Sequence, residues 1–185
     1  MVREMEVRHE YHSAAKYLHG ALILLIAIQF VTAWTMPGVR RGSVSSLVNT
    51  HMSFGVVILP FALLLLGMRF FRPVHKGEME TPGLQERTAI AVHYLLYALL
   101  ILVPFSGWAY ASSRGITVSL FGVFDLPQIF TNGSSFGRAL GGLHGALATL
   151  IGFIVLIHAA AALYHHVLLK DSVLTRMIPI PLKRQ

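Results

Sequence analysis

Histidine is the residue type in this sequence with the clearest capacity for chemistry. Ten are present, and five of them, His19, His51, His93, His144 and His158, lie within long apolar stretches. A polar side chain inside a membrane-spanning helix is costly and usually faces the interior of a helical bundle. Any one of these imidazoles is as readily explained by packing against a backbone carbonyl as by a functional role. Only the arrangement of all five histidines relative to one another can indicate a cofactor site.

Four apolar stretches are long enough to carry these histidines across a membrane. They cover residues 17–34, 47–68, 88–111 and 141–169, and none contains an Asp, Glu, Lys or Arg. A spanning helix needs about 20 such residues. The whole chain is 55% hydrophobic and 12% charged, whereas soluble domains carry roughly 25% charged residues. The sequence therefore predicts a single all-α domain over residues 1–185, a multi-pass transmembrane four-helix bundle.

Composition excludes several kinds of site and partner. The chain has no cysteine, so thiolate metal sites, iron–sulfur clusters and covalently attached c-type haem are ruled out. The net charge of +7 could in principle attract nucleic acid. Because the apolar excess is so large, we instead expect the positive charge to flank membrane spans and no nucleic acid to bind.

The basic residues also predict how the chain lies in the membrane. Most Lys and Arg residues fall in the N-terminal tail, the connection between the second and third stretches, and the C-terminal tail. These three segments share one side, and positive segments stay in the cytoplasm, so both termini are expected there. The opposite side keeps only Arg40, Arg41, Arg114 and Arg138. Its long connection, residues 112–140, is expected to form a partly ordered cap at the outer headgroups.

The depths of the histidines then form a pattern. Successive helices run in opposite directions, so His19 and His93 lie toward the cytoplasm, while His51 and His144 lie toward the outside. His158 follows His144 on nearly the same helix face, about 21 Å further along the axis. The outer site can only pair His51 with His144. The inner site pairs His158 with either His19 or His93.

Two imidazoles from facing helices, at each of two depths, are what axial ligation of two b-type haems requires, and bundle cores hold such cofactors. The rival interpretation is transport of a divalent metal by the same imidazoles. Zinc and similar ions usually take three or four ligands, often with a carboxylate, and the four stretches contain no carboxylate. The spacing therefore favours haem.

The sequence resembles the bacterial cytochrome b561 family, whose best-understood branch is the superoxide oxidases. The resemblance covers roughly residues 11–180 and rests on the four spans with their five histidines. Its most specific part is the fourth span and the tail after it, which contain His158-Ala-Ala-Ala-Ala-Leu-Tyr-His165-His166 and then Lys170-Asp171-Ser-Val-Leu174-Thr-Arg176-Met177-Ile-Pro179.

The resemblance implies a di-haem b-type cytochrome of the bacterial inner membrane that exchanges electrons with ubiquinone on the cytoplasmic side. It also implies that His19, rather than His93, completes the inner haem site with His158. His93 is then left near the haem or the quinone, and His165 matches a quinone contact.

Two functions follow as expectations. In the first, electrons pass from an outer donor such as superoxide through the two haems to ubiquinone, which makes the protein a superoxide:ubiquinone oxidoreductase. The outer arginines 40, 41, 114 and 138 would steer the anion, or they would neutralise haem propionates or bind lipid phosphate. In the second, the chain is a cytochrome subunit that serves a periplasmic dehydrogenase or another redox protein, docked on the long outer connection.

Overall fold

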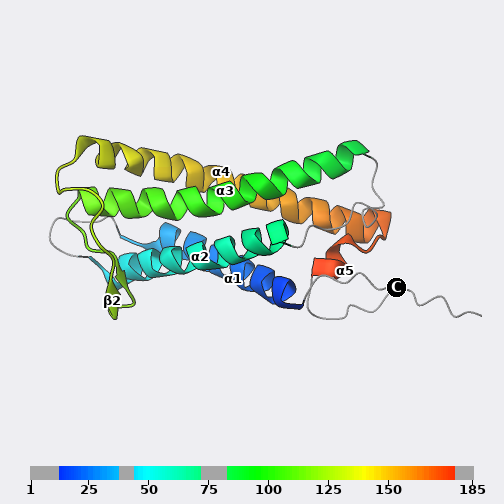
Figure 1. Ribbon diagram of the computed structural model, residues 1–185, viewed down its shortest axis with the longest axis horizontal. Coiled ribbons are helices and arrows are strands. Elements are labelled where there is room, and N and C mark those ends of the chain that lie inside the picture. Colours follow the sequence, from blue (N-terminus) through cyan, green and yellow to red (C-terminus); the bar gives the residue numbers. More distant parts are fainter. Residues whose placement is uncertain (1–12, 38–43, 72–82, 178–185) are drawn as a thin grey trace, which may run out of the picture.

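The computed structural model describes residues 13–37, 44–71 and 83–177, and most of them are helical (Figure 1). The long helices are α1 (Ser13–Thr35), α2 (Ser46–Phe71), α3 (Gly83–Ser113) and α4 (Ser135–Tyr164). A π-helical turn, η1 (His165–Leu169), continues α4, and the short helix α5 (Val173–Met177) follows it. Strands β1 (Ser119–Leu120) and β2 (Phe124–Asp125) form an antiparallel hairpin between α3 and α4.

Four of these helices are long and apolar enough to cross a membrane. Their outward faces are apolar as well: Leu24 of α1 and Phe153 of α4 are each 62% exposed. A helix that is hydrophobic all round is suited to lipid on its outer face. The expected fold class, an all-α transmembrane four-helix bundle, is therefore confirmed.

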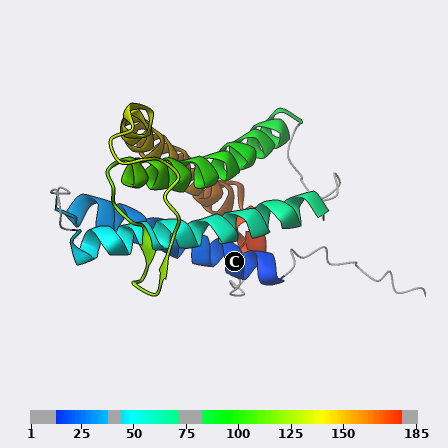
Figure 2. The same ribbon diagram turned by 60° about the vertical axis from the view of Figure 1, so that its left-hand side comes forward.

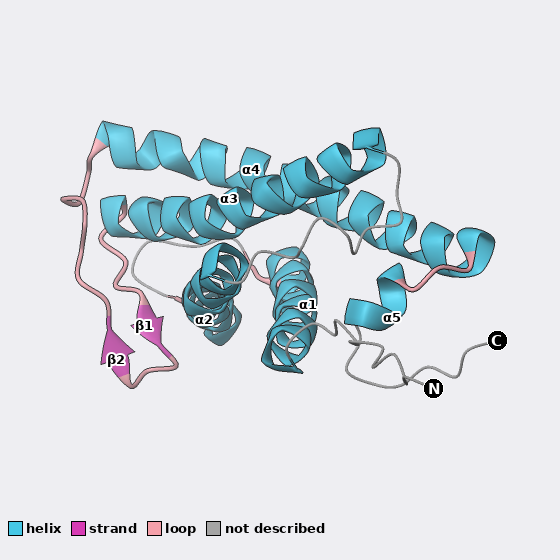
Figure 3. Cartoon of the chain, turned by 45° about the vertical axis from the view of Figure 1, so that its right-hand side comes forward, coloured by secondary structure: helices cyan, strands magenta, loops and turns pink. Residues whose placement is uncertain are grey.

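The bundle consists of two helix pairs, α1 with α2 and α3 with α4, as Figure 1 and Figure 3 show. The pairs join mainly where α2 packs on α3. Among the described residues, no Cα of α1 or α2 comes within 8 Å of a Cα of α4. The buried core lies between the pairs and consists of Leu22, Leu25, Ile58, Ala62, Leu65, Leu99, Leu100 and Ile151. The fold thus leaves α4 separated from α1 and α2 by side chains alone.

Two helices begin earlier than the apolar stretches indicate. Helix α3 starts at Gly83 rather than near residue 88, because Glu86 and Arg87 form a polar first turn outside the apolar part. Helix α4 starts at Ser135 rather than near residue 141, because the Ser134 hydroxyl accepts a hydrogen bond from the Gly137 N–H at 3.2 Å and caps the helix. Hydropathy alone does not register either polar turn.

The connection between α3 and α4, predicted from the charge pattern to lie on the outer side and called the outer connection, is an ordered cap held by serines at the end of α3. The Ser112 hydroxyl accepts a hydrogen bond from the Ile129 N–H at 2.9 Å, and the Ser113 carbonyl accepts one from the Gly133 N–H at 2.9 Å. Both serine residues are about 1% exposed. Figure 2 shows the β1–β2 hairpin crossing from the α3–α4 pair to α2. The cap therefore ties the two helix pairs together at the outer end.

Candidate cofactor sites

The outer histidines face each other across the gap between α2 and α4. The ring centres of His51 and His144 are 6.3 Å apart, and their planes are perpendicular at 90°. A metal that binds one imidazole nitrogen on each side, at about 2.0 Å from each, separates the ring centres by about 6 Å. The two rings therefore have the separation expected of two histidines that would hold one metal ion between them.

Hydrogen bonds fix which nitrogen of each outer histidine faces the gap. His144 Nδ1 donates to the Val103 carbonyl of α3 at 2.8 Å. His51 Nδ1 lies 3.2 Å from the Thr32 hydroxyl, which itself donates to the Ile28 carbonyl at 2.8 Å and so accepts from the imidazole. A hydrogen bond at one ring nitrogen sets the tautomer and leaves the other nitrogen free as a ligand. Both Nε2 atoms are thus available to a metal.

A glycine makes room for the His144 ring. A Cβ added to Gly107 of α3 would lie 2.9 Å from His144 Cε1 and 3.0 Å from Nδ1. Real Cβ atoms do not approach other atoms so closely. Gly107 therefore allows the imidazole to lie directly against the backbone of α3 and to reach the Val103 carbonyl. The sequence argument did not identify Gly107, because one more glycine in an apolar helix carries no distinctive signal.

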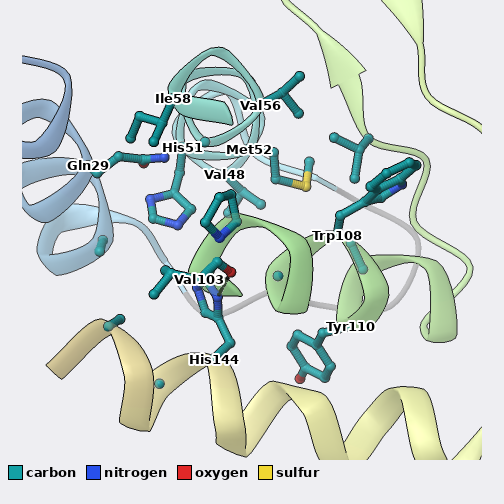
Figure 4. Close-up of a pocket in the computed structure, with 18 of the residues that line it drawn as sticks. Gln29, Val48, His51, Met52, Val56, Ile58, Val103, Trp108, Tyr110 and His144 are labelled. Atoms are coloured by element: carbon teal, nitrogen blue, oxygen red, sulfur yellow. Dashed lines mark hydrogen bonds between the residues drawn. The ribbon is translucent and has the colours of Figure 1, made fainter. Parts of the chain in front are cut away.

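A cavity of about 370 Å³ extends from the outer histidine pair (Figure 4). All four long helices and the outer connection contribute to its lining, which is largely apolar. Among the described lining residues, Arg114 is the only one with a permanently charged side chain. The Oε1 atom of Gln29 is buried beside the cavity without a hydrogen-bond partner. A flat apolar macrocycle with a few polar substituents fits such a lining, so the residues present are compatible with haem.

Three histidines meet at the inner end of the bundle. The ring centres of His19 in α1 and His158 in α4 are 6.4 Å apart at an interplanar angle of 73°. His93 in α3 lies closer to His158, at 5.1 Å, and its Nδ1 donates to the Ala89 carbonyl at 2.6 Å. Only the first separation matches the spacing of about 6 Å expected across a metal. The structure thus brings both candidate partners to His158, but at unequal distances.

His165 forms a close pair with an acid that the sequence argument did not single out. Its Nδ1 lies 2.5 Å from Asp171 Oδ2, and both side chains are 19% exposed. The second oxygen of Asp171 accepts a hydrogen bond from the Val173 N–H at 3.0 Å, at the start of α5. The chain turns between the two residues at Lys170, whose φ is 54°. An Asp shortly before a short helix is a familiar capping signal, and it could have drawn attention to Asp171.

The outer arginines are not gathered at one place. Arg114 borders the cavity, and its Nη1 donates to the Tyr110 hydroxyl at 3.1 Å. Arg138 is exposed in the first turn of α4 and does not border the cavity. Arg40 and Arg41 lie outside the described residues. Of the four arginines, the described structure therefore associates only Arg114 with the outer histidine pair.

No group of three or more His, Cys, Asp or Glu side chains within the described residues could hold a bare metal ion. The three inner histidines are included in that search. The geometry thus offers nothing specific in favour of the divalent-metal interpretation.

Comparison with known proteins also favours the haem interpretation over the divalent-metal interpretation. The family model described as prokaryotic cytochrome b561 matches residues 10–179. Cytochrome b561 homolog 1 of Escherichia coli is 29% identical over 167 residues, which cover 88% of this chain and 93% of the relative. A protein named probable superoxide oxidase CybB, from Yersinia pestis, is 31% identical over 170 residues, covering 88% and 92%. Cytochrome b562 of Cereibacter sphaeroides is 29% identical over 168 residues, covering 87% and 90%.

Proposed function

The chain belongs to the prokaryotic cytochrome b561 family, and from that premise we propose that it is a di-haem cytochrome that carries electrons across the bacterial inner membrane. A cytochrome b family implies haem b as the cofactor. The observation that carries the di-haem assignment is the presence of two imidazole pairs, at opposite ends of α4, with ring separations of 6.3 Å and 6.4 Å. One-electron transfer between two such centres is the chemistry that the bound haems would supply.

The proposed ligands are His51 with His144 at the outer site and His19 with His158 at the inner site. The hydrogen bonds from Nδ1 of His51 and His144 support the outer pair, because they orient each ring and raise its basicity. At the inner site the 5.1 Å separation of His93 and His158 is too short for an iron between them. We therefore assign His93 to the neighbourhood of the inner haem and not to the residues that would hold its iron.

We place ubiquinone at the end of the bundle where α1 begins and α5 lies. The positive charge of the tails makes this end cytoplasmic. Reduction of a quinone to a quinol takes two electrons and two protons. Asp171 accepts a hydrogen bond from Nδ1 of His165 and so orients the ring. Nε2 would then accept a hydrogen bond from a quinol hydroxyl or, once it has taken up a proton, donate that proton to the oxygen of the reduced quinone. His93 lies on α3 at the same end and is the second residue assigned to this side.

For the outer donor we favour superoxide, the substrate that the name of the Yersinia relative indicates for that protein. Two superoxide anions would each lose one electron and leave as dioxygen, and the two electrons with two protons would convert one ubiquinone to its quinol. The chain's contribution at the outer end is the positive charge of Arg114, which borders the cavity. A positive field at a site entrance raises the association rate of an anion by factors of roughly 10 to 10³.

A periplasmic redox protein is the second candidate donor. The ordered outer connection supports it, because an ordered cap tied to both helix pairs offers a fixed surface for docking. Such a partner would make the chain an electron-transfer subunit rather than an oxidase. The metal-transport alternative receives no support from the family match.

One set of spectra tests these assignments. Detergent-purified protein should contain two haems b per chain by pyridine haemochrome assay. A pulse of superoxide under anaerobic conditions should reduce them, and a soluble ubiquinone analogue should then reoxidise them. An Arg114→Gln variant should show slower reduction by superoxide and a weaker dependence of that rate on salt, with unchanged reduction by dithionite. Haem that stays oxidised after superoxide but is reduced by a co-purifying protein would establish the second donor instead.

A further inference from the structure

The β1–β2 hairpin has an exposed apolar tip that the electron-transfer function does not use. Val123 is 89% exposed, Phe124 60% and Phe121 50%. The tip turns at Gly122, whose φ of 75° suits glycine. A run of exposed large apolar side chains usually marks contact with a protein or with lipid.

The hairpin is fixed to the side of α2 and not above its end. The Ser53 hydroxyl, in a residue that is completely buried, accepts a hydrogen bond from the Phe121 N–H at 2.9 Å. It also lies 2.9 Å from the Ser119 carbonyl, to which it can donate. The ring of Phe54 packs edge-to-face on Phe121 with centres 5.2 Å apart. These contacts set the depth of the hairpin along α2.

That depth lies within the outer leaflet. Ser53 is about 10 Å along α2 from its outer end, in a helix about 39 Å long. The hydrocarbon of a bilayer is about 30 Å thick, so the ends of such a helix project only a few ångströms beyond it. Figure 1 shows the hairpin beside the first turns of α2, in agreement with the hydrogen bonds of Ser53. Ser53 is therefore roughly 6 Å inside the hydrocarbon, and the tip bonded to it is level with the outer part of the acyl chains.

Hydrogen bonds within the hairpin backbone suit a position among lipids. Unpaired backbone groups are very costly among lipids. The Val123 N–H donates to the Leu120 carbonyl at 3.0 Å, and the Leu126 N–H donates to the Val118 carbonyl at 2.8 Å. Asp125, the one acid of the hairpin, stands opposite Ser119 at the end away from the tip. The tip from Phe121 to Phe124 therefore carries no polar side chain, and the exposed Asp125 follows it at the base of the hairpin.

We propose that the tip of the β1–β2 hairpin, Phe121 to Phe124, inserts into the outer leaflet and contacts lipid acyl chains. The occupant is lipid because Ser53 and Phe54 hold the tip at bilayer depth, beside helices whose own outer faces are apolar. Insertion buries the apolar tip and braces the outer cap against the membrane. This inference rests on the membrane spans and is independent of the electron donor and acceptor.

The absence of cysteine from the chain makes a clean depth measurement possible. A nitroxide label is attached at Val123→Cys, and the protein is placed in lipid nanodiscs. The accessibility of the label is then measured from its collisions with oxygen, which concentrates among acyl chains, and with a nickel chelate, which stays in water. Phe153→Cys, on the apolar outer face of α4, is the lipid control, and Thr131→Cys, exposed elsewhere in the outer connection, is the water control. The oxygen-to-nickel ratio at Val123→Cys should exceed that at Thr131→Cys several-fold and approach that at Phe153→Cys.

Two results would overturn the proposal. A ratio equal to that of Thr131→Cys would put the tip in water. Protection of the label from both reagents would mean that protein, either a partner or a second copy, covers it. In the Ser53→Ala background the label should become more mobile and its ratio should fall toward the water control. If the mobility and the oxygen-to-nickel ratio of the label were unchanged in that background, the anchoring by Ser53 would be contradicted. The haem content of each variant shows separately whether the helix bundle is intact.

Discussion

The Gly107→Ala substitution tests the outer haem site through a single methyl group. The new Cβ would lie 2.9 Å from His144 Cε1. Favourable contacts between carbon atoms begin at about 3.5 Å, so the imidazole must retreat by about 0.6 Å or more. The retreat also strains the 2.8 Å hydrogen bond from Nδ1 to the Val103 carbonyl. The methyl group therefore acts on both the place and the orientation of the ring.

A shift of this size is large for a metal ligand. Ligand distances in metal sites hold within about 0.2 Å of their ordinary values. If His144 binds the outer haem iron, the Gly107→Ala protein should retain about half of its haem, with the inner haem intact. Forcing an extra methyl into a packed site also costs about 1–3 kcal/mol of stability.

Haem per chain, from pyridine haemochrome and reduced-minus-oxidised spectra, measures the loss. Gly142→Ala is the matched control, since it adds a methyl group to α4 two residues from His144 where nothing lies within 4 Å. Replacing glycine inside a helix gains about 0.5–1 kcal/mol, so this control should keep both haems and be slightly more stable. A Gly107→Ala protein with full haem content and unchanged potentials would refute the assignment of His144. Equal losses in both variants would show that the effect is unspecific.

Three further outcomes are expected. His144→Ala should lose one haem and keep the other, and retention of both would contradict the outer pairing. His93→Ala should keep both haems by haemochrome assay, and loss of a haem from that variant would reverse the inner pairing. Asp171→Asn should slow reduction of a ubiquinone analogue by about 10- to 100-fold, the usual scale for a group that orients a functional imidazole. Rapid-mixing spectra should show haem reduction itself unaffected, and equal slowing of both steps would argue against a quinone role for His165. Ser134→Ala should remove the cap of α4 at about 1 kcal/mol, lowering the thermal midpoint by about 2–4 °C, and an unchanged midpoint would contradict the cap.

The fold was largely predictable because the membrane imposes a strong pattern. Four long stretches free of charge can only be spans, and the structure has four such helices. The ends of the helices were harder to predict, because polar turns such as the one at Glu86 are helical but lie outside the hydrocarbon part of the membrane. The Ser134 cap is a local signal that a hydropathy profile does not detect. The β1–β2 hairpin was not foreseen, since strands of two residues leave no periodicity to detect.

The candidate site was predictable only in part, because depth along a helix is encoded in the sequence and proximity between helices is not. Counting residues placed His51 and His144 at one depth, and their rings lie 6.3 Å apart. The same counting left His19 and His93 as alternatives, and it was the family resemblance that implied His19. The unequal ring separations from His158, 6.4 Å for His19 and 5.1 Å for His93, support that proposal. The Val103 carbonyl and the missing side chain of Gly107 position His144 without any sequence signal. The partner of His165 lies beyond a left-handed turn at Lys170 that periodicity does not anticipate.

The outer cavity also predicts that folding depends on the cofactor. A haem bound there would fill a space of about 370 Å³ that the four helices line, and it would stabilise the folded chain because the unfolded chain does not offer that site. Helix α4 packs on α3 and has no backbone contact with α1 or α2 in the described residues, so the cofactor would lie where these helices are furthest apart. Protein made in haem-depleted cells should therefore be cleaved by added protease far faster than the haem-loaded form, and haem added before protease should restore resistance. Equal resistance of the two forms would mean that side chains or lipid fill the gap.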